Sequence, residues 1–366
     1  MSTRPVRFDQ VIPSIVERDA VSNHTFEAQR VLRSMGFVSE IFAGGWAPGL
    51  EGRVYPLSEL PREEGGGQWI CYQASIGSAA AEIVAGHPGL KIVNYHNITP
   101  AELIEAWMPS LGEEARLGRQ QLGELAPLCE LGIADSSYNA GELAELGYRR
   151  RTVAPLMMDL SALDRVLDGH LRDELGEAKA RGGSDWLFVG QLLPHKAHEE
   201  VVKAFACFLR LFDSGARLHL VGRPSCPAYA LAVRRFAEEI GIAGSVDFAG
   251  TVSAGELAAY YQAADVLVCC SRHEGFCAPL LEAMHHGVPV VAYGTAAVPE
   301  TVLDAGIILP SSAPVLVATA VQRVLTDPAL REVLIDRGRD RVRTLTLASA
   351  RRSFLGAVEQ ALASAQ

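Results

Sequence analysis

Short apolar runs alternate with helix-like segments along most of the chain. In the first half, five apolar runs predict buried strands: Phe8–Ile15, Val38–Ala43, Trp69–Gln73, Lys91–Tyr95 and Leu131–Ser136. Between them, three segments are typical of helices: Thr25–Met35, Ser78–Ala85 and Glu113–Glu124. Strand-then-helix repetition of this kind indicates a parallel sheet with helices on both faces, so the fold class is α/β.

The same alternation restarts after Gly183. It predicts five strands: Asp185–Gly190, Arg217–Val221, Ser245–Ala249, Val266–Cys270 and Val288–Tyr293. It also predicts helices, with bounds Glu199–Phe212, Tyr229–Ile240, Ala254–Ala263, Leu280–His286, Pro314–Thr326 and Pro328–Arg337. The pattern therefore describes two doubly wound halves of similar size.

The length of 366 residues exceeds what one hydrophobic core usually holds, and this favours two domains. We expect an N-terminal domain over residues 1–165 and a C-terminal domain over 185–345. The stretch Asp159–Gly183 is charged and ends in Arg-Gly-Gly, and it indicates a linker or hinge, to which we assign residues 166–184. A last helix, Leu347–Ser364 within 346–366, follows no strand and is expected to pack back on the N-terminal domain.

Composition narrows the classes of partner and compartment. The formal net charge of −10 argues against a nucleic-acid partner. No apolar run reaches the roughly 18 residues of a membrane span, and Met1–Phe8 lacks the apolar core of a signal peptide. Seven scattered cysteines without a Cys-x-x-Cys pair fit reduced thiols. We expect a cytoplasmic protein without a transmembrane segment; peripheral membrane association and a homodimer stay open.

The candidate chemistry is concentrated in residues 271–300. Pro279 suits the start of a short helix, and Gly287 ends it. Glu274 falls in the loop before this helix and Glu282 inside it. A loop and helix start that follow a strand are where open α/β sheets bind ligands, and helix N-termini favour anions.

Two carboxylates eight positions apart fit more than one interpretation. They could form a glycosidase acid/base pair, although the sequence gives neither their separation nor a raised pKa. In the interpretation we favour, Glu282 accepts two vicinal hydroxyls, as acidic residues do for ribose, and Glu274 meets the other end of the ligand. The backbone N–H groups of Gly275, Phe276 and Cys277 suit hydroxyls or phosphate oxygens. Alternatively, the Glu282 carboxylate could have a purely structural role, as a negative charge that interacts favourably with the helix dipole near the helix start.

Two other loops in this half follow strands. Lys196, near the start of a helix, could neutralise a phosphate, although a solvated surface lysine is the more frequent case. The loop Gly250-Thr-Val-Ser253 could present backbone groups to a base. The alternative, which the residues alone favour, is that Ser253 caps the next helix.

Several ordered motifs together resemble the retaining glycosyltransferases of family 4. The run Glu274-Gly-Phe-Cys-Ala-Pro-Leu-Leu-Glu282-Ala-Met, followed by Gly287-Val-Pro-Val-Val, is similar to their Glu-x7-Glu motif. Upstream, Gly-x-Leu-x-Pro-x-Lys196, Leu220-Val-Gly222 and Val246-x-Phe-x-Gly250-x-Val occur in the family's order. Looser matches are Ser136-x-Tyr-Asn-x-x-Glu-Leu and Tyr95-His-Asn-Ile-Thr-Pro100. The resemblance implies the GT-B fold, with two Rossmann-like doubly wound domains facing a central cleft.

By position, the resemblance implies a site for a nucleoside-diphosphate sugar. Glu282 would hold the ribose, and Glu274 the transferred sugar, with the amides of Gly275–Cys277 near sugar and diphosphate. Lys196 would meet the distal phosphate, and His96 of the first domain the donor sugar or its reacting face. The remaining candidates are Gln191, Gly250, Val252 and Arg223 for the donor, and Ser22 and Asn23 for the phosphates or the acceptor.

One residue departs from the family pattern. The family usually has an arginine five positions before the phosphate lysine, where this chain has Gln191. Glutamine brings no charge, so phosphate stabilisation would lean on Lys196 with Arg223 or Arg272. The resemblance implies no metal, and no Asp-x-Asp is present to hold one.

The expected function is therefore that of a metal-independent retaining glycosyltransferase. It would move a sugar from a nucleoside-diphosphate sugar, with no other cofactor, to a hydroxyl of a glycan or a small-molecule acceptor. A sugar-nucleotide epimerase of the same architecture and a catalytically degenerate nucleotide-sugar-binding protein are the alternatives.

Overall fold

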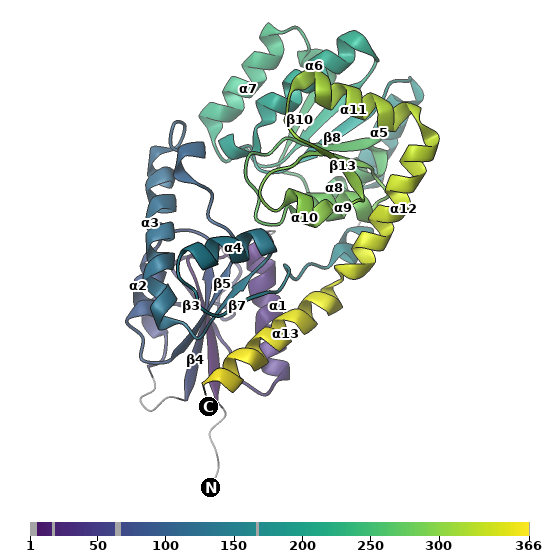
Figure 1. The fold of residues 1–366 in the computed structure, drawn as a ribbon. Coiled ribbons are helices and arrows are strands. Elements are labelled where there is room, and N and C mark those ends of the chain that lie inside the picture. Colours follow the sequence, from purple (N-terminus) through teal and green to yellow (C-terminus); the bar gives the residue numbers. More distant parts are fainter. Residues whose placement is uncertain (1–5, 17–18, 63–66, 166–167, 366) are drawn as a thin grey trace. The chain divides into compact units, whose positions relative to one another are not determined.

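The computed structural model describes residues 6–16, 19–62, 67–165 and 168–365, which form two compact units (Figure 1). The first unit contains the chain up to Glu105, Pro109–Met158 and the chain from Leu345 onwards. The second contains Ala106–Met108 and Asp159–Thr344. Each is described by itself.

The first unit is built on a parallel seven-stranded sheet in the order β3-β2-β1-β4-β5-β6-β7. Its strands are β1 (Arg7–Ile12), β2 (Ile41–Ala43), β3 (Tyr55–Pro56), β4 (Gln68–Ala74), β5 (Leu90–Tyr95), β6 (Leu131–Ala134) and β7 (Arg151–Val153). Its helices are α1 (Ala20–Ser34), α2 (Ala79–Ala85), α3 (Pro109–Leu125), α4 (Ser137–Glu145) and α13 (Leu347–Ser364). Register is continuous along β4, which pairs with β1 on one side and β5 on the other.

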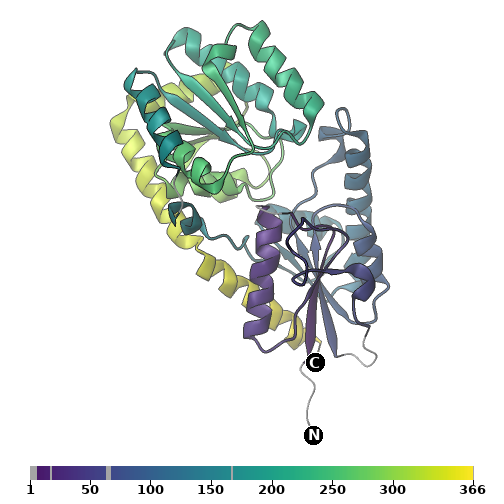
Figure 2. The ribbon, with the colours of Figure 1, turned by 180° about the vertical axis from the view of Figure 1, so that it is seen from behind.

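Alternate residues of the central strands supply two hydrophobic cores, because side chains of a strand point to opposite faces. Ile70 and Tyr72 of β4 join a core with α2, α3 and α4, whereas Trp69 and Cys71 join a core with α1 and α13. Phe354 of α13 is fully buried in the second of these cores. Figure 2 shows α1 and α13 from behind, on the same face of the sheet.

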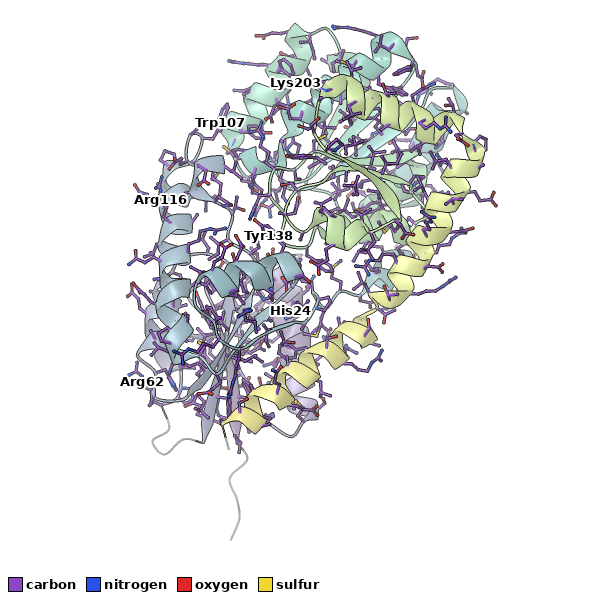
Figure 3. All side chains as sticks on the ribbon, viewed as in Figure 1. His24, Arg62, Trp107, Arg116, Tyr138 and Lys203 are labelled. Carbon is purple, nitrogen blue, oxygen red and sulfur yellow. The ribbon has the colours of Figure 1, made fainter. Side chains whose placement is uncertain are left out.

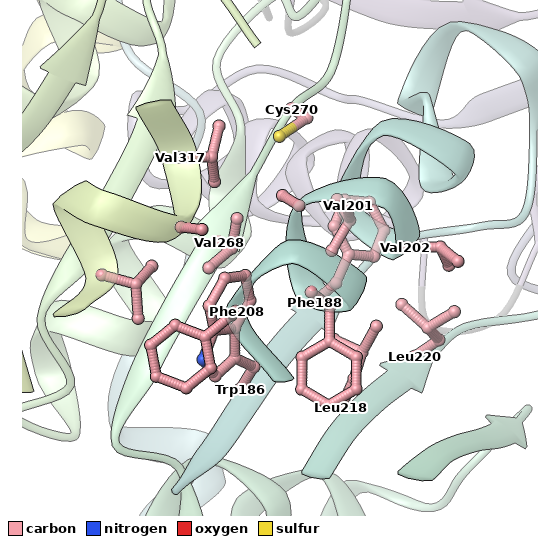
Figure 4. Close-up of a cluster of buried hydrophobic side chains, with 14 of the residues drawn as sticks. Trp186, Phe188, Val201, Val202, Phe208, Leu218, Leu220, Val268, Cys270 and Val317 are labelled. Carbon is pink, nitrogen blue, oxygen red and sulfur yellow. The ribbon is translucent and has the colours of Figure 1, made fainter. Parts of the chain in front are cut away.

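The second unit has a parallel six-stranded sheet in the order β10-β9-β8-β11-β12-β13. Its strands are β8 (Asp185–Val189), β9 (Arg217–Val221), β10 (Val246–Gly250), β11 (Val266–Cys269), β12 (Val290–Tyr293) and β13 (Gly306–Leu309). Its helices are α5 (Gly169–Ala180), α6 (His198–Leu211), α7 (Pro227–Glu239), α8 (Ala254–Ala263), α9 (Ala278–His285), α10 (Val298–Val302), α11 (Pro314–Thr326) and α12 (Pro328–Thr344). The core is aromatic at β8 and α6, where Trp186 packs against Phe205 and Phe208 at centroid distances of 5.5 and 5.0 Å (Figure 4).

The prediction of two doubly wound α/β halves is confirmed. Within it, several details differ from the sequence expectation. Helix α1 begins at Ala20, five residues early, because the carboxylate of Asp19 accepts from the backbone N–H of Ser22 and caps it. The strands β3, β7 and β13 and the helices α4 and α10 were not predicted.

Residues 166–184, expected to be a linker, contain helix α5 of the second unit. Lys179 ties that helix down, since its ammonium donates to the Ala263 carbonyl and pairs with Asp265 at 2.9 Å. The first unit accordingly gives way to the second between Met158 and Asp159. A charged helix on the surface has the same composition as a charged linker, and this is why the sequence pattern did not separate them.

Helix α12 continues seven residues beyond its predicted end at Arg337. The next residue, Gly338, lies against α9. A Cβ at this position would stand 3.2 Å from the Cβ of Met284. Gly338 thus permits close helix packing and does not end the helix.

Candidate functional site

Both sheets reverse their strand order once, between β1 and β4 in the first unit and between β8 and β11 in the second. Ligands of open α/β sheets bind outside the carboxyl ends of the strands at such a reversal. In the second unit, the loop after β8 carries Lys196 and the loop after β11 carries Glu274. The two residues lie 78 positions apart in the chain and meet at this point of the sheet.

Lys196 and Glu274 form a bidentate ion pair. The Lys196 Nζ atom donates to Glu274 Oε1 at 2.7 Å and to Oε2 at 2.8 Å. The Glu274 side chain is 7% exposed and that of Lys196 22%. Burial would lower the pKa of Lys196, but the Glu274 carboxylate outweighs it, and the pKa lies above its ordinary value. The site therefore holds a fixed ammonium beside a fixed carboxylate.

The helices that follow these two loops begin in the same unusual way. Ala197, the N-cap of α6, has φ of +52°, and Cys277, the N-cap of α9, has φ of +64°. Residues other than glycine pay roughly 1 kcal/mol or more for this left-handed conformation. Such strain is concentrated at functional sites, and here it stands on both sides of the Lys196–Glu274 pair.

Neighbouring loops hold the Glu274 segment in place through its backbone. The Arg272 N–H donates to the His195 carbonyl at 2.7 Å, which joins the loops after β8 and β11. The Ala297 N–H donates to the Glu274 carbonyl at 3.1 Å. Thr301 Oγ1 donates to the Phe276 carbonyl at 2.6 Å. These bonds leave the segment Gly275–Cys277 in a defined conformation at the start of α9.

Glu282, one helical turn further on, is bound by a tyrosine of α8. Tyr261 Oη donates to Glu282 Oε2 at 2.6 Å, and the Tyr261 ring stacks on His286 at 5.2 Å. Burial raises the pKa of Glu282, and the hydrogen bond from Tyr261 partly offsets this. Sequence reasoning missed Tyr261, because nothing in the α8 segment marks one tyrosine as a partner of the next helix.

Gln191 and Arg223 gather beyond the ends of β8 and β9. Gln191 Oε1 accepts from Ser225 Oγ at 2.6 Å and, at 3.4 Å, from Arg223 Nη2. Both Gln191 and Arg223 are exposed, so the guanidinium is available at this edge of the site.

Gly222, which follows β9, allows the loops after β8 and β9 to approach each other closely. A Cβ on Gly222 would lie 1.9 Å from the Gly190 carbonyl oxygen. The Gly222 N–H in turn donates to the Gly250 carbonyl, which brings the β10 end into the same group. Val252 follows in the next loop, and Ser253 caps α8 with a capping box to Glu256, as the favoured alternative predicted.

Arg272, the other candidate for charge compensation, is already engaged. Its guanidinium pairs with Glu199 at 2.7 Å and with Glu200 at 3.4 Å, both in the first turn of α6. Lys196 is likewise ion-paired, with Glu274, whereas Arg223 contacts the uncharged side chains of Ser225 and Gln191.

In the first unit, His96 is buried and bound at both ring nitrogens. Nδ1 lies 2.9 Å from Asp135 Oδ2, and Nε2 lies 2.6 Å from Gln73 Oε1. Burial raises the pKa of Asp135, and the charge and hydrogen bond of His96 oppose this. The predicted site histidine is thus an internally satisfied group in the structure. Its partners were not identified from the sequence, although Asp135 directly follows the apolar run that ends at Ala134.

A chain of amides fixes the proton on His96 Nε2. Gln10 Nε2 donates to the Thr25 carbonyl at 2.9 Å, so Gln10 Oε1 faces Gln73. Gln73 Nε2 donates to that oxygen at 2.7 Å and turns its own Oε1 to His96. An oxygen there requires a proton on His96 Nε2.

Ser22 and Asn23 belong to the first turn of α1, together with His24. Ser22 is buried; its Oγ donates to Asp19 Oδ2 at 3.1 Å and accepts from the Val16 N–H at 3.0 Å. The Ser22 hydroxyl therefore helps to stabilise the N-terminal cap of α1. Asn23 is exposed. The structure gives these two residues no feature of a phosphate site beyond their place at a helix N-terminus.

His24, labelled in Figure 3, is a buried histidine that sequence reasoning passed over. Its Nδ1 accepts from the Met157 N–H at 3.1 Å, and its ring lies 4.8 Å from that of His96. Burial and the charge of His96 hold the pKa of His24 well below its ordinary value. Neutral His24 then donates from Nε2, and turning the Asn94 amide supplies the acceptor, since Asn94 Oδ1 has no other partner among the described residues.

Comparison with protein families gives one match, to the family described as "Glycosyl transferases group 1", over residues 176–341. The D-inositol 3-phosphate glycosyltransferase of Thermomonospora curvata is 31% identical over 231 residues, which are 60% of this chain and 53% of the relative. The chain thus spans about half the length of this curated relative.

Solved structures match over nearly the whole chain. Sucrose-phosphate synthase from Thermosynechococcus elongatus has a TM-score of 0.77 at 20% identity and covers 98% of this chain and 100% of its own. Anabaena HepE, solved with UDP and glucose, has a TM-score of 0.76 at 13% identity, covering 96% and 99%. These likenesses confirm the GT-B fold. Across the described residues, every helix is too short or too polar to cross a membrane.

Proposed function

We propose that the chain is a retaining glycosyltransferase, because residues 176–341 match the family of group 1 glycosyl transferases and the D-inositol 3-phosphate glycosyltransferase of Thermomonospora curvata is similar to it. It would transfer a sugar from a nucleoside-diphosphate sugar to an acceptor hydroxyl. The observation that carries this proposal is the Lys196–Glu274 ion pair at the strand-order reversal of the second unit. An ammonium and a carboxylate held side by side match a ligand that is anionic at one point and rich in hydroxyls at the next.

Donor binding would exchange the partners of this pair. The distal phosphate takes the Lys196 ammonium, which can then stabilise the negative charge that develops on the leaving diphosphate. Glu274, released from Lys196, accepts hydrogen bonds from the sugar hydroxyls. The backbone N–H groups of Gly275–Cys277 and the α9 N-terminus favour the diphosphate between them. The ion pair thus holds both groups in place before the donor arrives.

The nucleoside end would be held by Glu282. A carboxylate can accept from both hydroxyls of a ribose, and Tyr261 already binds one of its oxygens and orients it. Arg223 and Gln191, at the ends of β8 and β9, would meet the phosphates, and Gly250 and Val252 the base. In the first unit, we assign His96 to the donor sugar: its Nε2–H would exchange Gln73 for a sugar hydroxyl.

The acceptor is proposed only as a class. The curated relative's name refers to D-inositol 3-phosphate, a small polyhydroxylated acceptor, and this makes inositol phosphates a sensible first panel beside oligosaccharides and small glycosylated natural products. The acceptor hydroxyl would attack on the face from which the diphosphate leaves, and a diphosphate oxygen would take its proton.

The test is release of nucleoside diphosphate from UDP-, GDP-, ADP- and dTDP-sugars, with and without each acceptor. We expect one donor to be consumed in an acceptor-dependent manner, and Glu274→Ala to abolish this. Glu238→Ala, an exposed carboxylate on α7, is the matched control and should retain activity. Donor conversion without acceptor would indicate the epimerase, and donor binding without turnover on the whole panel the degenerate binder; either result overturns the proposal.

A further inference from the structure

Two cysteines lie beside the Lys196–Glu274 pair, and their thiol groups take no part in the proposed transfer. Cys269 ends β11, and Cys277 is the N-cap of α9. Their sulfur atoms are 4.0 Å apart, and both side chains are buried, at 4% and 7% exposure. The two sulfurs and a Glu274 carboxylate oxygen all lie within 4.8 Å of one another.

The distance between the two sulfur atoms matches a tetrahedral cation site. With zinc–sulfur bonds of about 2.3 Å and a tetrahedral angle, the two sulfurs should be roughly 3.8 Å apart. The observed 4.0 Å therefore needs almost no movement. A disulfide would need the same sulfurs about 2.05 Å apart, so the geometry favours a bridging cation over a direct bond.

Two thiolates and one carboxylate also define the class of cation. Thiolates select soft or borderline ions such as zinc over magnesium or calcium, which prefer oxygen ligands. Three protein ligands leave a fourth position open. Binding would release the thiol protons to solvent and involves no redox step.

The backbone of Cys277, in the same cluster, has an unusual left-handed conformation. The left-handed conformation at φ of +64° is one that glycine adopts without strain, so a cysteine is conformationally costly there. In this strained conformation, the Cys277 sulfur lies 4.0 Å from the Cys269 sulfur.

We propose that Cys269, Cys277 and Glu274 bind a zinc-class divalent cation, which competes with Lys196 for Glu274 and so inhibits the transferase. Both Glu274 oxygens are held by Lys196 in the structure. A cation on one of them weakens that pair and occupies the carboxylate that the sugar requires. The binding half of the proposal stands on the geometry alone, whereas the inhibitory half rests on the proposed function.

Cobalt(II) is the probe for the binding half, because thiolate ligation gives it a near-ultraviolet charge-transfer band and a tetrahedral site gives it intense visible bands. Reduced, untagged, metal-free protein is titrated with cobalt. We expect one equivalent to bind with both features, and added zinc to bleach them. Cys277→Gly, which suits the local backbone, and Cys269→Ser should each weaken binding at least tenfold.

Cys226→Ala is the matched control: it removes another buried cysteine of the same unit and should leave the cobalt spectrum unchanged. Absence of the charge-transfer band in the wild type, or an equal band in Cys277→Gly, overturns the site. Loss of two hydrogens by mass under a mild oxidant, without a cobalt band, also overturns it and identifies a disulfide pair.

Inhibition is measured separately, as the fraction of each variant's own activity that zinc removes. Zinc should inhibit the wild type and Cys226→Ala and spare Cys277→Gly. Equal inhibition of all three overturns the inhibitory half. If no donor is turned over at all, the proposed function fails while the cobalt spectra still decide the metal site.

Discussion

In each unit, polar groups lie near the strand-order reversal of the sheet, but their hydrogen-bond partners and exposure differ. In the first unit, His96 is bound at one end by Asp135 and at the other by a chain of two glutamines that ends on a backbone carbonyl. In the second unit, Lys196 and Glu274 are each other's main ion-pair partners, and the pair is partly exposed to solvent. In the first arrangement both ring nitrogens of His96 are bound within the protein, whereas the second offers two charges that a ligand can separate.

The two arrangements differ in how much they contribute to the stability of the fold. A buried network whose members are all satisfied rigidifies its surroundings and is costly to interrupt. An ion pair that is partly exposed contributes less to stability and is easier to exchange. We therefore expect substitutions in the first unit to act mainly on stability, and those in the second mainly on catalysis.

The largest effect should come from Lys196→Ala, which we expect to lower kcat about 10²- to 10³-fold, as loss of a group that stabilises transition-state charge typically does. The measurement is nucleoside diphosphate release under saturating donor. Lys203→Ala removes a half-exposed lysine of α6, labelled in Figure 3, and should stay within twofold of wild type. If both lysines had equal effects, the ion pair would not be the functional group.

Asp135→Ala should destabilise the first unit by about 3 kcal/mol or more, because it leaves His96 buried without its carboxylate. Hydrogen exchange of β5 and β6 measures this within the unit. Glu40→Ala breaks an exposed pair with Arg33 in the same unit and should cost less than about 1 kcal/mol. Similar costs for the two variants would remove the contrast drawn above.

The pH dependence of stability should change in opposite directions when one histidine is replaced in each unit. The pKa of buried His24 is lowered, so its contribution is lost as pH falls below the unfolded value of about 6.5. Burial lowers the pKa of His219, but hydrogen bonds to Asp185 and Asp247 outweigh this and raise it. Its contribution is present below about pH 6.5 and lost as pH rises through the folded pKa.

The measurement is the difference in thermal stability between wild type and each histidine-to-glutamine variant from pH 5 to 8. His24→Gln should become relatively more stable on acidification. The deficit of His219→Gln should be greatest at low pH and shrink as pH rises. Parallel difference curves would contradict the assigned pKa directions.

The smallest effect should be that of Ala197→Gly at the left-handed N-cap of α6. Relief of strain offsets the loss of a buried methyl group, so the free energy of unfolding should change by less than about 1 kcal/mol. Ala204→Gly, buried inside the same helix, has no strain to relieve and should cost more than about 1 kcal/mol. Equal losses at the two positions would show that the backbone at Ala197 is not strained.

The sequence predicted those elements whose pattern is local. The helix Ala254–Ala263 and the strand Arg217–Val221 were predicted residue for residue, because each has caps or turns at both ends. The two-residue strand β3 contains Pro56, and a proline within so short a segment gives no strand pattern.

The candidate site residues were selected from the sequence one by one, but their contacts with one another were not predicted. Lys196, Glu274 and Glu282 could be selected because each follows a strand in a recognised motif. Their partners are remote: Lys196 meets Glu274 across 78 positions, and Tyr261 meets Glu282 across 21. Such pairs depend on strand order, which no local pattern contains. The same holds for the sulfur pair of Cys269 and Cys277.

The placement of α13 has a consequence for synthesis on the ribosome. This helix supplies Phe354, Ala357 and Val358 to the core that Phe8 and Trp69 begin, yet residues 159–344 are made in between. Chains emerge N-terminus first, so the sheet face that α1 and α13 share stays partly uncovered until α13 has been made. A nascent chain stalled before Leu347 should therefore bind holdase chaperones at its first unit while its second unit is already folded.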